Sequence, residues 1–315
     1  MRLDDYRTSD NVRDAGIGGG GFGGGSGFGG GGGGLGGGLG LIIGLIASRF
    51  GIVGVLVALG IAWALGMFGG GGSGLVSTGQ PGAVSGAQAT NNAQEACSRS
   101  EVRRFSCQVL ANTEDTWAQL FQANGQRYQP AGFAFFEQGV DSGCGSVPSA
   151  AGPFYCPNDN SVYLDTTFFN ELQTKFGAAG DFAQAYVIAH EVGHHIQTIT
   201  GTSDQVRRAQ ASLGQAQGNR YQVAMELQAD CYAGVWAARS RARDGQSALS
   251  PGDVQEGLRA AQAIGDDNLQ KQAQGYVVPE SFTHGTSAQR QQWLQRGLQT
   301  GDPAQCDTFG SLGLS

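Results

Sequence analysis

The sequence places three of its four histidines within six positions, in the segment AYVIAHEVGHHIQTITG at residues 185–201. Two of them, His190 and His194, flank a glutamate in the pattern His-Glu-x-x-His. On a helix, residues four apart lie one turn apart on the same face, so both imidazoles could bind one zinc ion. Glu191 would then lie beside a metal-bound water and could take its proton as a general base.

A catalytic zinc takes three protein ligands, so this motif leaves one ligand to find. The neighbouring His195 faces about 100° away from His194 on a helix, and we interpret it as a supporting or packing residue. The extended pattern His-Glu-x-x-His-x-x-Gly-x-x-His fails, because the sequence has Gln197 and Thr200 at the required glycine and histidine positions. Both options that use histidine alone are therefore disfavoured.

The segment ELQAD at residues 226–230 offers a carboxylate instead. Glu226 and Asp230 are four apart and share a helical face, in a segment that is otherwise mostly apolar. Two acids in such surroundings need a partner, and a zinc ion with its histidines would supply one. We therefore predict Glu226 as the third ligand and Asp230 as the acceptor of a hydrogen bond from a ligand histidine. The alternative is an exposed acidic pair on a solvated face.

The fourth histidine, His284, lies in the segment SFTHGTSAQRQQW at residues 281–293. Its imidazole could stabilise a developing oxyanion or hold a substrate carbonyl. Arg290 in the same segment could pair with a carboxylate of the site. From the chemistry alone, a histidine in a surface loop is the alternative.

These residues must be positioned by a domain that we expect to be α+β, mostly helical, with a small antiparallel sheet. Asp181 is the expected N-cap of the helix that carries the histidines, and Gly201 its stop. Helical spacing of apolar residues predicts helices at residues 99–122, 169–176, 181–200, 220–243, 251–264 and 286–299. Strand-like runs occur at residues 132–140, 153–156 and 161–165, with a turn signal at 157–160.

The six cysteines all lie in the part of the chain that can form a core, at positions 97, 107, 144, 156, 231 and 306. An even number favours disulfides in an oxidising compartment. Sequence alone does not fix their pairing. Proximity in the chain favours Cys97–Cys107 and Cys144–Cys156, which leaves Cys231–Cys306. Buried free thiols are the alternative.

The N-terminal part of the chain has a different composition. Residues 16–40 are mostly glycine and lack the side chains for a core, so we expect residues 1–49 to be a disordered tail. Residues 50–68 carry no charge over a length close to the about 20 residues that cross a bilayer as a helix. A buried core helix is disfavoured there because glycine-rich flanks offer nothing to pack against.

The basic residues near residues 50–68 predict an orientation for this segment. Arginines precede it, and no Lys or Arg occurs between residues 69 and 98. The positive-inside tendency then places the N-terminus in the cytoplasm and the rest in the periplasm. We thus expect a single-pass inner-membrane protein with an uncleaved anchor, a flexible linker at 69–95 and an extracytoplasmic domain at 96–315.

The charge composition argues against nucleic acid as a partner. The net charge is −7 and only 14% of the residues are charged. No basic stripe of the kind that neutralises phosphates is visible.

Several of these segments together resemble the neutral zinc metallopeptidase family of bacteria: HEVGHH at 190–195, ELQAD with CYAGVW at 226–236, THGTSAQR at 283–290, PFYCPNDNSVYLD at 153–165 and SDNVRD at 9–14. His-Glu-x-x-His followed by Glu-x-x-x-Asp resembles the gluzincin group of zinc proteases. Thr283-His284 with Arg290 is similar to an element of membrane-bound CaaX-type and heat-shock metalloproteases, in which Pro stands where this chain has Gly285.

The resemblance implies a zincin-like protease domain with one zinc ion per chain and a peptide or protein substrate. It implies His284 as a site residue, and a strand at Val162 to Asp165 that binds an extended peptide by strand addition. The expected function is a zinc endopeptidase with Glu191 as general base. The alternatives are a metal-stabilised envelope scaffold protein without activity and a zinc amidase acting on cell-wall peptides.

Overall fold

The computed structural model describes residues 1–17 and 88–314. The predicted transmembrane helix at 50–68, most of the glycine-rich segment and most of the linker at 69–95 lie outside the described residues. The membrane prediction needs correction, because across the described ranges no helix combines the length and apolarity that a membrane crossing requires.

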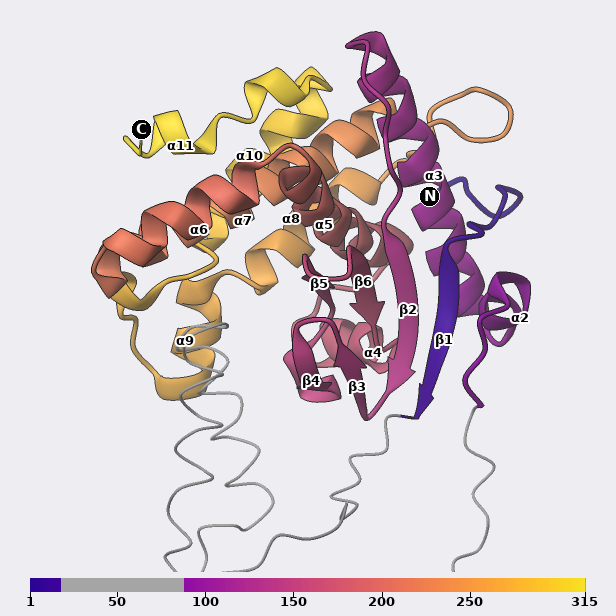
Figure 1. The fold of residues 1–315 in the computed structure, drawn as a ribbon, viewed down its shortest axis with the longest axis horizontal. Coiled ribbons are helices and arrows are strands. Elements are labelled where there is room, and N and C mark those ends of the chain that lie inside the picture. Colours follow the sequence, from indigo (N-terminus) through magenta and orange to yellow (C-terminus); the bar gives the residue numbers. More distant parts are fainter. Residues whose placement is uncertain (18–87, 315) are drawn as a thin grey trace, which may run out of the picture.

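A six-stranded sheet forms one side of the domain (Figure 1). Its strands are β1 (Val12–Ile17), β2 (Gly132–Glu137), β3 (Gly139–Ser142), β4 (Gly145–Pro148), β5 (Phe154–Cys156) and β6 (Ser161–Leu164). The order is β4-β3-β2-β6-β5, and β1 also pairs with β2. The predicted antiparallel sheet is wrong, because β2 runs parallel to both β1 and β6. The α+β class itself is confirmed.

Helices make up most of the rest of the domain, and of these α2 packs against β1 and α5 against β5 and β6 (Figure 1). They are α2 (Ala93–Ser98), α3 (Glu101–Ala123), α4 (Thr167–Thr174), α5 (Asp181–Ile199), α6 (Thr202–Ser212), α7 (Gln215–Arg239), α8 (Asp253–Ala263), α9 (Asp266–Gln274), α10 (Ser287–Thr300) and α11 (Thr308–Ser311). Short 3-10 turns occur at Ser149–Ala151, Pro279–Ser281 and Pro303–Gln305. Helix α5 lies in the centre, packed against α3, α7 and α8, which explains why its sequence is apolar on most sides.

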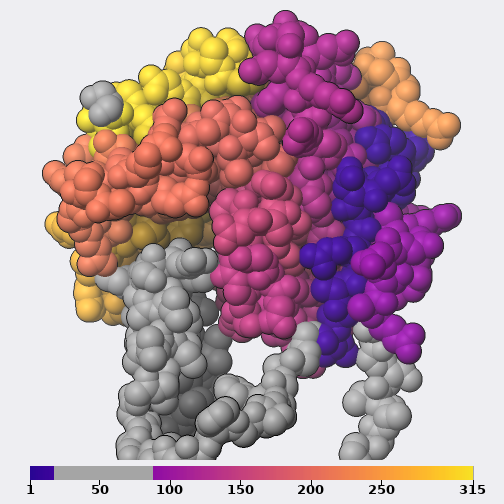
Figure 2. All heavy atoms as spheres, in the orientation of Figure 1, coloured from indigo at the N-terminus to yellow at the C-terminus, as the bar shows by residue number. Residues whose placement is uncertain are grey.

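Residues 1–17 are part of this domain, not a disordered tail. Leu3 and Val12 are buried in the main core. The buried Asp14 contacts the guanidinium groups of Arg99 and Arg103, and its backbone pairs with Thr90 through hydrogen bonds of 2.8 and 2.9 Å. In Figure 2 the indigo atoms of this segment lie between the sheet and the purple atoms around α2.

This arrangement overturns the predicted topology. A cytoplasmic N-terminus separated by a membrane from the rest of the domain is wrong, because β1 is a strand of the same sheet as β2 and β6. The end of the predicted linker is also structured: Thr90 bridges to Asp14, and α2 begins at Ala93.

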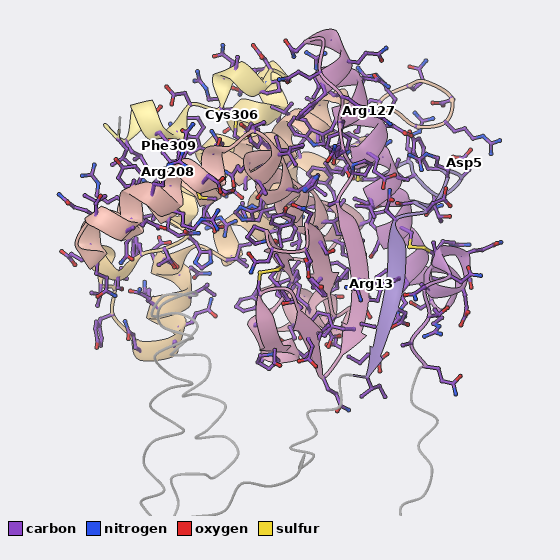
Figure 3. The ribbon with its side chains drawn as sticks, viewed as in Figure 1. Asp5, Arg13, Arg127, Arg208, Cys306 and Phe309 are labelled. Carbon is purple, nitrogen blue, oxygen red and sulfur yellow. A yellow bond between two sulfur atoms is a disulfide. The ribbon has the colours of Figure 1, made fainter. Side chains whose placement is uncertain are left out.

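The three predicted disulfides are confirmed. Cys97–Cys107 joins α2 to α3, Cys144–Cys156 joins the β3–β4 turn to β5, and Cys231–Cys306 joins α7 to the C-terminal segment. The sulfur–sulfur bonds appear in yellow in Figure 3. The predicted N-cap of α5 is wrong: the cap is Gly180, and the carboxylate of Asp181 contacts the α-amino group of Met1.

Candidate metal centre

The two helices that carry the predicted ligands approach closely because a glycine separates the histidines. A Cβ atom on Gly193 of α5 would lie 3.0 Å from the Cα atom of Ala229 on α7, so a larger residue would push the helices apart. Gly193 lies between His190 and His194, and Ala229 lies between Glu226 and Asp230. The contact therefore brings the two motifs face to face.

Three donor atoms converge between these helices. The Nε2 atom of His190 lies 3.1 Å from Oε2 of Glu226, and Nε2 of His194 lies 3.5 Å from the same oxygen. The two imidazole rings are nearly perpendicular, at 88°, with centroids 4.8 Å apart. One ligand atom from each residue lies within 4.8 Å of the others, so this set could hold a metal ion.

The spacing of these donors fits zinc. Ligand atoms about 2.0–2.1 Å from a tetrahedral zinc ion lie about 3.3 Å from one another. The observed separations of 3.1 and 3.5 Å bracket that value. Two histidines and one carboxylate are a typical catalytic donor set, because three protein ligands leave a fourth position for water or substrate.

The outer nitrogen of His190 is held by a buried ionic network. The fully buried Asp230 accepts hydrogen bonds from His190 Nδ1 at 2.8 Å and from the hydroxyl of Tyr186 at 2.6 Å. Arg290 of α10 donates to both oxygens of Asp230, at 2.8 and 2.9 Å. Burial alone would raise the pKa of Asp230, but Arg290 and His190 outweigh it and lower the pKa to about 2.

His195 lies away from the donor set, as its position on the helix predicts. Its Nε2 atom donates to the backbone carbonyl of Gln129 at 2.7 Å, and its Nδ1 atom lies 3.1 Å from the hydroxyl of Tyr155 on β5. Because a carbonyl only accepts, Nε2 carries a proton, while the hydroxyl of Tyr155 also lies 3.0 Å from Oδ1 of Asn160. His195 therefore ties α5 to strand β5.

His284 lies in a short loop that a buried aspartate organises. Oδ2 of the fully buried Asp266 accepts the backbone N–H groups of Thr283, His284 and Gly285, at 2.7, 2.6 and 3.1 Å. Oδ1 lies 3.2 Å from His284 Nδ1. Burial would lower the pKa of His284, but the carboxylates of Glu226 and Asp266 outweigh burial and raise it.

Gly285 explains the difference from the element with proline at this place. Its backbone has a φ of 88°, whereas proline is fixed near −65°. The loop of this chain therefore takes a path that proline excludes.

Glu191 lies on α5 between the two donor histidines, and only 8% of its surface is exposed. Its charge contributes to the pKa of His194. Burial would lower that pKa, but the carboxylates of Glu226 and Glu191 raise it to about 9. Glu226 responds in the opposite sense: burial would raise its pKa, yet His194 and His284 hold it well below its usual value.

These shifts predict how the metal-free protein responds to pH. A folded-state pKa of about 9, against about 6.5 when unfolded, means that His194 contributes stability fully below about pH 6.5 and loses it as pH rises towards 9. We expect the free energy of unfolding to fall by on the order of a few kcal/mol across this window. Urea denaturation of the zinc-free protein at pH 6.5, 7.5 and 9 measures it. A His194→Asn variant should give a flatter profile, and a flat wild-type profile would contradict the prediction.

The strand expected to bind substrate is not free to do so. Val162 to Leu164 belong to β6, which lies between β2 and β5 and pairs with both. The prediction for Val162 to Asp165 is therefore corrected. In the described sheet, the outer edge on this side belongs to β5.

Two polar partners of the site, Tyr186 and Asp266, are not among the residues predicted from the sequence. Tyr186 lies four residues before His190, so the same helical spacing that links the histidines could have identified it. Asp266 lies 18 residues before His284, at the start of another helix, and no local spacing points to it.

The sequence is similar to proteins of one family along almost its whole length. The profile of the family described as "Putative neutral zinc metallopeptidase" matches residues 1–309. The chain is 49% identical over 257 residues to "Uncharacterized protein YpfJ" of Escherichia coli (strain K12), covering 82% of this chain and 87% of that protein. It is 43% identical over 226 residues to "Uncharacterized protein Mb2605" of Mycobacterium bovis, covering 68% and 74%. No solved structure matches the chain.

Proposed function

Because the chain belongs to the family described as putative neutral zinc metallopeptidases, we propose that it is a zinc-dependent endopeptidase of the gluzincin type. His190, His194 and Glu226 bind one zinc ion per chain in this proposal. The observation that carries it is the convergence of three ligand atoms at spacings that suit tetrahedral zinc.

Each of the surrounding residues has a chemical task in this proposal. When bound, zinc polarises the scissile carbonyl and lowers the pKa of a water molecule. Glu191 accepts the proton of that water and delivers it to the leaving amine. His284, oriented by Asp266, donates a hydrogen bond to the oxyanion that develops on the substrate. Asp230 keeps the proton of His190 on Nδ1, which leaves the lone pair of Nε2 for the metal.

Strand β5 is the proposed platform for an extended substrate. Its outer edge is the free edge of the described sheet beside α5, and Tyr155 of β5 contacts His195 of α5 at 3.1 Å. A peptide that pairs with this edge would run past the helix that carries Glu191. Backbone pairing of this kind binds many sequences, which suits an endopeptidase acting on peptide or protein substrates.

Removal and return of the metal test the proposal. We expect the full chain to hydrolyse casein, to lose that activity when a chelator removes its zinc, and to recover it when one equivalent of zinc per chain is returned. Peptidoglycan peptides should be tested in parallel. Cleavage of these and not of casein would indicate an amidase, and one tightly bound zinc without hydrolysis of either would indicate a non-catalytic protein.

A further inference from the structure

The two donor histidines are held by different kinds of partner. His190 donates to a carboxylate, which can only accept, so its tautomer is fixed by one contact. His194 instead meets an amide: its Nδ1 atom lies 2.9 Å from Oε1 of Gln197, one turn along α5. An amide side chain can turn over and present its NH2 group in place of its oxygen. Something further must therefore hold Gln197 in one orientation.

A chain of buried hydrogen bonds supplies that constraint. The NH2 group of Gln197 donates to the backbone carbonyl of Met225 at 2.7 Å and to Oε1 of Gln228 at 3.1 Å. The NH2 group of Gln228 donates to the backbone carbonyl of Cys306 at 3.0 Å. Gln197 is fully buried and Gln228 is 8% exposed, so water has little access to these bonds.

The direction of these hydrogen bonds follows from the two backbone carbonyls at which they end. Carbonyl oxygens only accept, so the Met225 and Cys306 carbonyls require the NH2 groups of Gln197 and Gln228 to face them. The oxygen of Gln197 must then face His194, which places the proton of that imidazole on Nδ1. The lone pair of Nε2 is left pointing at Glu226 and at the proposed metal position.

We propose that Gln197 and Gln228 are positioning residues that fix His194 as the Nδ1–H tautomer and so set the zinc affinity of the site. Two backbone carbonyls, of Met225 and Cys306, determine the orientation of both amides. This inference rests on the proposed function, because it concerns the affinity for the proposed metal.

The inference makes the C-terminal segment part of the metal site. Cys306 and Phe309 are labelled on this segment in Figure 3. A disulfide joins Cys306 to Cys231 of α7, and Cys231 directly follows Asp230 in the sequence. The hydroxyl of Thr308 donates to the backbone carbonyl of Ala224 at 2.6 Å, and its N–H donates to the Cys306 carbonyl at 3.0 Å. The backbone carbonyl of Cys306, which ends this series of hydrogen bonds, is thus fixed by the disulfide and by Thr308.

Matched pairs of substitutions test the proposal in the full chain. Gln197→Met removes the acceptor from His194, and Gln228→Met removes one of the two bonds that orient Gln197. We expect about 10- to 100-fold weaker zinc binding for the first and about 10-fold for the second. Gln197→Glu keeps an acceptor for His194, and Gln228→Glu keeps an acceptor for Gln197. Both glutamate variants should stay within about threefold of wild type in zinc affinity, although a buried carboxylate lowers their stability.

Two measurements apply to every variant: the zinc dissociation constant, from competition with a chelator, and the magnetic resonance signal of the His194 Nδ1–H proton in the zinc-loaded protein. We expect Gln197→Met to lose this signal, Gln228→Met to weaken it, and the glutamate variants to keep it. Gln217→Met, at an exposed position of the same helix α7, is the control and should match wild type in both.

The pattern across the pairs decides the outcome. Equal losses for methionine and glutamate would show a merely structural role and overturn the inference, as would wild-type affinity in all four variants. If Gln228→Met does not fold, the pair at Gln197 decides alone. Absence of zinc binding in the wild-type protein would instead overturn the proposed function, and this inference with it.

Discussion

Replacing Glu191 with glutamine is expected to lower peptide hydrolysis by about 10²- to 10⁴-fold while the protein keeps its zinc. The amide has the shape of the carboxylate but cannot accept a proton from water. Glu191 is not one of the three converging donors, so the metal site should remain. The rate constant kcat/KM on a quenched fluorescent peptide measures the first effect, and chelator competition measures the second.

The control for this variant is Glu171→Gln. Glu171 is exposed on α4 and pairs with Lys175 at 2.8 Å, so its loss should leave the rate unchanged. An E191Q protein that retains more than about a tenth of the wild-type rate would refute the role of general base. Loss of zinc together with activity would instead indicate that Glu191 helps to hold the metal.

The helical part of the site could be predicted because its geometry is local. The spacing of His190 and His194 follows from one helical turn, and Gly193 lets a second helix approach that turn. Glu226 and Asp230 stood out because acids are costly in an apolar helix without a partner. In the structure both carboxylates contact His190, at 3.1 and 2.8 Å, so each buried acid has the polar partner that it needs.

The N-terminal strand could not be predicted because its partners are distant in sequence. Val12 lies opposite Phe133 in the sheet, and β1 contains only the short run VRDAGI before the glycine-rich segment begins. Amino-acid composition does not show that β1 pairs with β2. The sequence around Asp14 likewise does not predict the contacts of its carboxylate with Arg99 and Arg103.

The direction of the strands was missed for a related reason. The run from β5 to β6 is an antiparallel hairpin, as the turn at residues 157–160 suggests. The parallel pairing of β2 with β6 depends on the intervening segment folding back, because β3, β4 and β5 lie between them in sequence. Asp266 could not be predicted either, because its contact with His284 forms only when two segments pack together.

Replacing Arg290 with methionine is expected to destabilise the metal-free protein by about 3–5 kcal/mol. Arg290 is 2% exposed and neutralises Asp230, which is fully buried, so the substitution leaves a buried carboxylate without its cation. Urea denaturation with the disulfides intact measures the loss. Arg104→Met, at an exposed position of helix α3, is the control and should change stability by no more than about 0.5 kcal/mol.

A double substitution separates the stability of this network from its role at the metal. Arg290→Met combined with Asp230→Leu removes both charges, so most of the lost stability should return. Zinc affinity should stay about 10- to 100-fold below wild type, because His190 Nδ1 has lost its acceptor. Stability and zinc affinity that recover together would show that Asp230 serves only to balance Arg290. Recovery of stability alone would show that the carboxylate orients His190 for the metal.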